Sequence, residues 1–220
     1  MKLFILISIL WLAVVQNAFA QLRNNAEVIP QLDVRRYLGY GQVAGEYEDA
    51  KNKVSLEGVA YDLGIWHKRW NSQITASWGI SLFDMEGIQQ LNGNETTVQY
   101  ERTSLNASLG YGFAFGFAQI HPQYMVGYGQ GKFSKSTYGS SLTEVYGETT
   151  SDVTVNGPEL LVHFDLTRHF FVGLKAGYYE NSGEVKYSGD TGKVKASTTL
   201  LLTLGYRSWR NYGYYDGIIE

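Results

Sequence analysis

The chain has 220 residues, with 18 Lys and Arg, 21 Asp and Glu, 25 Gly, 17 Tyr, 3 Pro and no Cys, and a formal net charge of −3 at pH 7. A slightly acidic chain has no electrostatic attraction for nucleic acid, and a chain without cysteine has no disulfide, thiolate metal site or cysteine nucleophile. Abundant Gly and Tyr with so little Pro favour long strands over a Pro-rich disordered chain.

The first twenty residues have the pattern of a secretory signal peptide. Lys2 is their one charged residue, an apolar run extends from Leu3 to Val15, and Ala18-Phe19-Ala20 provides a small-residue cleavage site. Because the run is too short to span a bilayer, we expect residues 1–20 to be removed before Gln21. Gln rather than Cys at this position disfavours a lipid-anchored lipoprotein. Residues 21–33 are then expected to form a polar periplasmic lead.

The mature chain alternates apolar and polar residues with period two, which indicates β-strands with one apolar face. The clearest case is residues 73–82, where every second residue from Ile74 to Leu82 is apolar and the others are small or polar. Helical spacing would scatter these apolar residues around the cylinder. The pattern predicts eight strands, at residues 36–47, 56–66, 73–82, 104–113, 119–128, 159–166, 172–178 and 194–206. The facing of the first is ambiguous.

The connections between these segments alternate in length. Short turns are predicted around residues 67–71, 114–117 and 167–169, and longer polar loops around 48–53, 84–95, 131–152 and 180–192. Short turns on one rim and long loops on the other are typical of outer-membrane barrels, with the long loops outside the cell and both termini in the periplasm.

The loop at residues 131–152 is the chief candidate for a contact with the outside world. It has mixed charge and several tyrosines, and its surface-contact candidates are Lys132, Lys135, Tyr138 and Tyr146. The alternative is a loop that is merely solvated and shields the barrel.

Alternation alone does not say which face points inward, because a soluble barrel also alternates. The polar face here carries Ser, Thr, Gly, Asn and Gln with few charges, which suits a crowded barrel interior. Several segments reach the roughly 9 to 11 residues that cross a bilayer on a tilt. Aromatic residues near both ends of the strands, such as Trp66 and Phe171 by the short turns and Tyr47, Tyr100 and Phe133 by the long loops, suggest two girdles. We therefore expect lipid to meet the apolar face, and a soluble periplasmic barrel is the rival.

Over residues 34–209 this pattern resembles the small OmpA- and OmpX-type outer-membrane barrels. The stretch Leu202-Thr203-Leu204-Gly205-Tyr206 is similar to the aromatic-ended last strand that the barrel-assembly machinery recognises in such proteins. The resemblance implies an all-β fold, an eight-stranded antiparallel up-and-down transmembrane β-barrel, in contact with outer-membrane lipid and lipopolysaccharide. The chain departs from that pattern in continuing through a Tyr-rich tail at residues 210–220, so the residue that marks the true end of the barrel stays open.

An eight-stranded barrel has an interior that side chains fill. Charges of both signs are assigned to the inward face, namely Glu57, Asp62, Arg102, Glu159, His163, Asp165, Lys175, Lys195 and Arg207. Because buried charges must be paired or hydrated, we expect a packed polar plug. Within it we expect Lys175 to pair with Glu159. Lys195 would lie at a similar height to Glu46 across the closing seam if the first strand faces Glu46 inward. The alternative is a small channel for ions or hydrophobic solutes.

No catalytic constellation is evident in the sequence. A serine hydrolase needs a His within reach of a Ser and an acid that orients the His, and the His-x-Ser arrangement of lipid A deacylases of this shape does not occur. His163 with Asp165 is the nearest approach and is expected to be a structural pair. The other three histidines have no metal-ligand spacing. We expect no enzyme activity, metal or cofactor, and a structural or surface-interaction role whose extracellular partner the sequence does not identify.

Overall fold

The computed structural model describes residues 32–50, 53–69, 73–91, 94–139, 143–167, 169–186 and 191–210. Its strands are β1 (Leu32–Glu48), β2 (Lys53–Arg69), β3 (Ile74–Leu91), β4 (Asn94–Tyr111), β5 (Phe113–Phe115), β6 (Ala118–Tyr138), β7 (Thr143–Asp165), β8 (Phe170–Asn181), β9 (Glu184–Lys186) and β10 (Thr191–Arg210). The expected signal peptide, the lead up to residue 31 and the tail from residue 211 lie outside the described residues. Within the described ranges no helix is long and apolar enough to cross a membrane.

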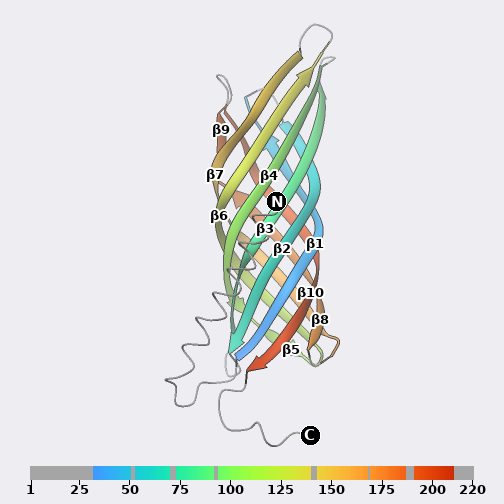
Figure 1. Cartoon of the computed structure of the whole chain (residues 1–220), viewed down its shortest axis with the longest axis vertical. Coiled ribbons are helices and arrows are strands. Elements are labelled where there is room, and N and C mark those ends of the chain that lie inside the picture. Colours follow the sequence, from blue (N-terminus) through green and yellow to red (C-terminus); the bar gives the residue numbers. More distant parts are fainter. Residues whose placement is uncertain are drawn as a thin grey trace, which may run out of the picture.

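Eight long strands form one closed antiparallel barrel (Figure 1). The strand order is β1-β2-β3-β4-β6-β7-β8-β10, and β1 pairs with β10 to close the ring. The short strands β5 and β9 pair with β6 and β10, respectively. The predicted eight-stranded antiparallel up-and-down barrel is therefore confirmed. Its first strand begins at Leu32, so the barrel includes Asp33, which the sequence had placed in the lead.

Two of the four connections expected to be long loops are mostly strand. β3 and β4 pair without interruption from Ile74↔Tyr111 to Leu91↔Asn94, which removes the loop expected at residues 84–95. β6 and β7 pair up to Tyr138↔Thr143, within the loop expected at residues 131–152. The expectation failed because these stretches also alternate with period two, but with the polar residues on the other face.

Along each long strand except β10, which has a bulge, every second side chain among those described keeps pointing inward, while the polarity of the inward and outward faces is exchanged part of the way along. On β3, Ser81 is buried and Leu82 is exposed, but the next pair reverses this, with Phe83 buried and Asp84 exposed. β4 changes in the same way, because its inward residues pass from Ser108 and Ser104 to Tyr100 and Val98.

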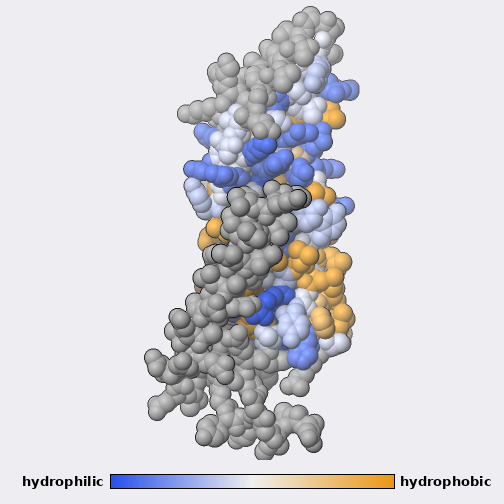
Figure 2. Space-filling model, in the orientation of Figure 1, coloured by the Kyte–Doolittle hydropathy of each residue, from blue (hydrophilic) through white to orange (hydrophobic). Residues whose placement is uncertain are grey.

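The exchange divides the barrel into two halves. In the "belt half" (the described residues among 32–42, 59–82, 104–128, 156–178 and 200–210), large apolar side chains predominate on the outward face and most polar ones face inward. In the "charged half" (the described residues among 43–58, 83–103, 129–155 and 179–199), charged and other polar side chains face outward and most inward side chains are apolar. Figure 2 shows the two halves as an apolar region below and a hydrophilic region above. The outward side chains of the belt half include Leu38, Tyr40, Leu105, Leu109, Tyr124, Val126, Leu174, Leu200, Leu202 and Leu204.

The interior of the charged half is filled by an apolar core. Phe133 on β6 packs between Tyr100 on β4, at 4.4 Å between ring centroids, and Tyr47 on β1, at 6.0 Å. The same cluster contains Met85, Leu56, Phe83, Tyr179 and valines from several strands, and it continues into the belt half through Ala60, Met125 and Leu201. Phe133, Tyr100 and Tyr47 were expected in an outer girdle, and the structure corrects this, because the exchanged polarity buries them inside the barrel.

Replacing Phe133 by Ala should lower the free energy of unfolding by about 3 to 5 kcal/mol, because the truncation leaves a cavity among packed rings. Tyr138→Ala at the exposed end of the same strand is the matched control and should change it by less than about 0.5 kcal/mol. Urea unfolding in detergent measures both. Equal losses for the two variants would contradict the assignment of the apolar core.

Candidate functional site

The interior of the belt half contains most of the buried charged side chains and both buried histidines of the described residues. β7 shows how it is organised, because its inward positions Asp165, His163 and Glu159, counted away from the rim with the short turns, belong to three different side-chain groups. We call these the Arg–Asp cluster, the ring group and the lysine group.

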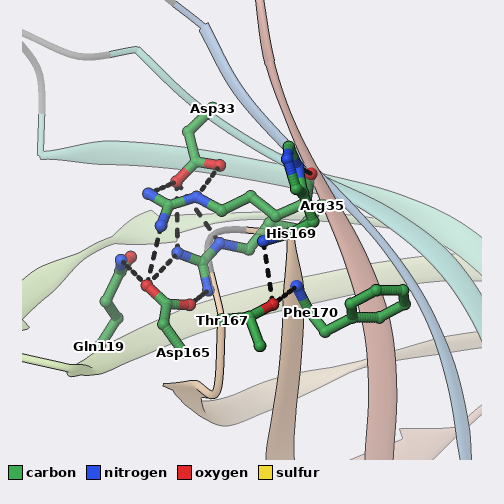
Figure 3. A network of polar contacts seen from close by, with 8 residues as sticks. Asp33, Arg35, Gln119, Asp165, Thr167, His169 and Phe170 are labelled. Atoms are coloured by element: carbon green, nitrogen blue, oxygen red, sulfur yellow. Dashed lines mark hydrogen bonds and ion pairs between the residues drawn. The ribbon is translucent and has the colours of Figure 1, made fainter. Parts of the chain in front are cut away.

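The Arg–Asp cluster consists of Asp33, Arg35, Asp165 and Arg207, and Figure 3 shows it from close by. Arg207 donates to both carboxylate oxygens of Asp33, at 2.9 and 2.7 Å, and to Asp165 at 2.8 Å. Arg35 donates to Asp165 at 2.7 and 3.2 Å and contacts Asp33 at 3.3 Å. The Nε2 of Gln119 adds a contact to Asp165 at 3.4 Å. Two guanidinium groups thus neutralise two carboxylates through charge-assisted hydrogen bonds.

Sequence reasoning found only half of this cluster. Asp165 and Arg207 were assigned to the interior, but Asp33 was placed in the lead and Arg35 preceded a strand of ambiguous facing. Asp33, Arg35 and Tyr37 are alternate residues of β1, so they share one face of the strand, and all three are buried. Extending the alternation of β1 back to residue 33 is the signal that could have placed both charges inside.

The ring group lies next to this cluster and contains two imidazoles. His121 on β6 and His163 on β7 are 5.2 Å apart between ring centroids, and both contact Trp66, at 4.4 and 5.8 Å. Phe171 lies 4.7 Å from His163. The Arg35 guanidinium lies over Trp66 and Phe171, at 5.4 and 5.2 Å from the ring centroids. Trp66 and Phe171, expected in a girdle, are therefore interior residues, and so is His121, whose role the sequence did not reveal.

The expected structural pair of His163 with Asp165 is wrong. Both side chains point into the barrel, but Asp165 is held by the two arginines, and neither ring nitrogen of His163 has a hydrogen-bond partner among the described residues. Guanidinium groups outcompete a neutral imidazole for a carboxylate, because their hydrogen bonds are charge-assisted and bidentate.

The lysine group is centred on Lys175 of β8. Its Nζ lies 2.7 Å from Asp62 and 2.8 Å from Glu159, so the predicted pair of Lys175 with Glu159 is present, together with a second carboxylate. Tyr179 donates to Glu159 at 2.9 Å and Tyr37 donates to Asp62 at 3.3 Å. Ser81 and Ser108 donate to the remaining carboxylate oxygens. A buried ion pair is tolerated when its remaining lone pairs are satisfied in this way.

Two charges assigned to the interior lie outside. Glu57 is exposed, because it shares its facing with the outward Tyr61 on β2. Lys195 is exposed because the pairing of β1 with β10 shifts between Gly45↔Ser197 and Tyr47↔Val194. This β-bulge reverses the facing of the residues beyond it.

The conditional pairing of Lys195 with Glu46 inside the barrel is consequently not present, and two exposed pairs take its place. Lys195 pairs with Glu48, and Glu46 pairs with Lys53 at 3.0 Å. Arg102, by contrast, is buried as expected, although it lies in the charged half rather than among the polar groups of the belt half.

The surface-contact candidates of the expected loop belong to strands, and one of them is buried. Lys135 points into the charged half and its Nζ lies 2.5 Å from Asp49, so it is not a surface contact. Lys132 is half-buried and Tyr138 is exposed, and the side chain of Tyr146 lies outside the described part of the chain.

The described side chains include no group of three or more His, Asp or Glu that could hold a metal ion. The polar interior instead has the chemistry of a bracing network: oppositely charged groups from β1, β2, β7, β8 and β10 are joined across the barrel. Such a network links strands far apart in the sequence and fills the space between them.

No family model matches the chain, and no curated protein matches it. Solved structures with a similar shape include Ail, the attachment invasion locus protein of Yersinia pestis, in complex with the heparin analogue sucrose octasulfate (13% identity, 82% of this chain and 100% of that chain covered, TM-score 0.42). They also include the outer membrane protein OprG of Pseudomonas aeruginosa (10% identity, 81% and 96% covered, TM-score 0.48). A major outer membrane protein of Thermus thermophilus is similar too (11% identity, 80% and 99% covered, TM-score 0.49). The likeness is one of fold, and no residue role is carried over.

Replacing Lys175 by Met should lower the free energy of unfolding by about 3 to 5 kcal/mol, because two buried carboxylates lose their cation. Adding Glu159→Gln to this variant should restore part of the loss, and a double-mutant cycle by urea unfolding in detergent measures the coupling. Lys53→Met, which removes an exposed pair, is the control and should cost at most about 1 kcal/mol. Strictly additive losses for Lys175 and Glu159 would show that the pair does not act as a unit.

Proposed function

We propose that the chain is an integral protein of the bacterial outer membrane, with its belt half in the bilayer and its charged half projecting from it. The observation that supports this most directly is the exchange of polarity between Leu82 and Phe83 and at the same height on the other strands. In the belt half large apolar side chains face outward all around the ring, which a water-soluble barrel would expose at high cost. In the charged half the pattern is that of a protein in water.

The dimensions of the belt agree with a bilayer. On β3 the belt extends from Ile74 to Leu82, which is about the 9 to 11 residues that a tilted strand needs to cross the hydrocarbon. A closed barrel also leaves no backbone edge unpaired within the lipid. The short turns at the end of the belt half are then periplasmic, and the hairpins β3–β4 and β6–β7 extend beyond the outer leaflet.

We further propose a closed barrel with a structural or surface-interaction role. In the belt half the Arg–Asp cluster and the lysine group join opposite walls, and in the charged half the apolar core around Phe133 fills the interior. A path for ions would have to cross both layers. The charged half is the surface available to an extracellular partner, while lipopolysaccharide and outer-membrane lipid would surround the belt.

The contacts of the interior also favour a non-enzymatic role. The acid nearest to a histidine along the sequence, Asp165, is engaged by Arg35 and Arg207, and His163 packs against aromatic rings. Neither arrangement activates a serine hydroxyl, which needs a histidine oriented by an acid.

The position of the bilayer can be tested with two arginine substitutions on the outward face of β10. Leu204→Arg lies near the middle of the belt and should lower the free energy of unfolding in lipid vesicles by about 2 to 4 kcal/mol. Thr198→Arg lies just beyond the belt and should cost no more than about 1 kcal/mol. Similar losses at both positions would place the bilayer elsewhere.

The closed state can be tested with protein refolded in detergent and inserted into a planar bilayer. Faster migration of the unheated protein on a denaturing gel, with no discrete current steps, is the result that supports the proposal. Discrete conductance steps would replace it with the channel alternative. Good solubility in buffer without insertion would overturn the membrane assignment.

A further inference from the structure

Arg102 on β4 is the buried cation that differs from all the others in the described interior. Its side chain points inward in the charged half and is 1% exposed. Arg35, Lys135, Lys175 and Arg207, the other buried cations of the described residues, each contact at least one carboxylate. No described carboxylate forms an ion pair with Arg102.

The contacts of Arg102 satisfy only part of its guanidinium group. The face of the group lies 3.8 Å from the ring centroid of Phe83, and Nη1 donates to Oδ1 of Asn181 at 2.5 Å. Nε and Nη2 have no hydrogen-bond partner among the described residues, and neither does Nδ2 of Asn181. These free groups are all N–H donors, so together they form a donor set without an acceptor.

A guanidinium group stays charged in proteins, and a buried charge without a counter-charge costs several kcal/mol in free energy. The lysine group carries one negative charge in excess, but its carboxylates are held by Lys175, Tyr179 and serine hydroxyls rather than by Arg102. The Arg102 guanidinium group, with one positive charge and free N–H donors, would therefore be stabilised by one negative charge beside it. A water molecule would satisfy the donors but would not supply that charge.

The Arg102–Asn181 contact lies where the regular strand pairing of β8 ends. Asn181 is the last residue of β8 and is partly exposed. The pairing of β8 with β7 ends at Val155↔Asn181, and its pairing with β10 ends at Glu180↔Ala196. Beside the Arg102–Asn181 contact the regular pairing of β8 is thus interrupted, within the half of the barrel that has a charged exterior. One backbone hydrogen bond, from Ser182 to Thr154, follows, and β9 resumes the pairing with β10 at Glu184↔Lys193.

We propose that Arg102 and Asn181 form a binding site for a small monovalent inorganic anion, such as chloride, that is reached from the water around the charged half. The anion accepts hydrogen bonds from Nε and Nη2 of Arg102 and from Nδ2 of Asn181. It neutralises the guanidinium group and stabilises the junction between β4 and the end of β8.

The first test measures the thermal midpoint of unfolding of the refolded full chain in detergent, in sodium chloride and in sodium gluconate at equal ionic strength. Chloride at about 100 times its Kd should raise the midpoint of the wild type by about 5 °C in a saturable manner. Arg102→Met should abolish this difference, because Met fills a similar volume without charge or donors. Lys132→Met, which removes a cation on the outward face of β6, should retain it. A chloride effect of the same size in Arg102→Met would overturn the proposal.

The second test does not depend on the folding of a variant. Crystals of the wild type grown in sodium bromide should show an anomalous peak within hydrogen-bond distance of the Arg102 guanidinium. Absence of that peak at full bromide occupancy elsewhere in the crystal would overturn the proposal, even if the stability of the protein depends on salt.

Discussion

The inward or outward direction of each side chain is the constraint on which the rest of this structure depends. In a closed sheet successive residues point to opposite sides, and the closing pairs between β1 and β10 fix the register around the whole ring. A residue such as Phe83 points inward because Ser81 does, whatever its polarity. The environment outside the wall can change along the barrel, but the facing cannot change without a bulge.

The two kinds of interior follow from this constraint and from the proposed position in the membrane. Where lipid surrounds the wall, the outward positions take the apolar residues, and the inward ones are left to serines, glutamines and charges that must find partners within the barrel. The Arg–Asp cluster and the lysine group are the result, and each draws its members from strands far apart in the sequence. Where water surrounds the wall, the inward positions are free to form an ordinary apolar core, as around Phe133.

Arg102 lies where these two kinds of interior meet, which explains its unusual surroundings. It follows the inward Tyr100 and precedes the inward Ser104 on β4, so one side of it is apolar and the other is polar. Phe83 and Asn181 satisfy the guanidinium group in part, but the carboxylates of the polar interior are engaged by other residues. A buried charge at such a boundary is a natural place for a bound counter-ion.

The sequence by itself determined the number of strands, their antiparallel order and most of the belt, because period-two alternation is a local property that each segment shows on its own. It also placed Lys175 and Glu159 together, since neighbouring strands joined by a short turn have a countable register. The sequence reading failed beyond Leu82. There the alternation continues, but the apolar residues occupy the other face, so the stretch resembles a polar loop to a reader who follows only the face that was apolar before. Only the tertiary structure decided that Lys195 lies outside, that Asp33 and Arg35 join Asp165 and Arg207, and that His121 meets His163. The first fact depends on a bulge and the second on the closure of β1 against β10 and on contacts across the ring. The third depends on the register of β6 against β7. None of these leaves a mark in the local pattern of residues.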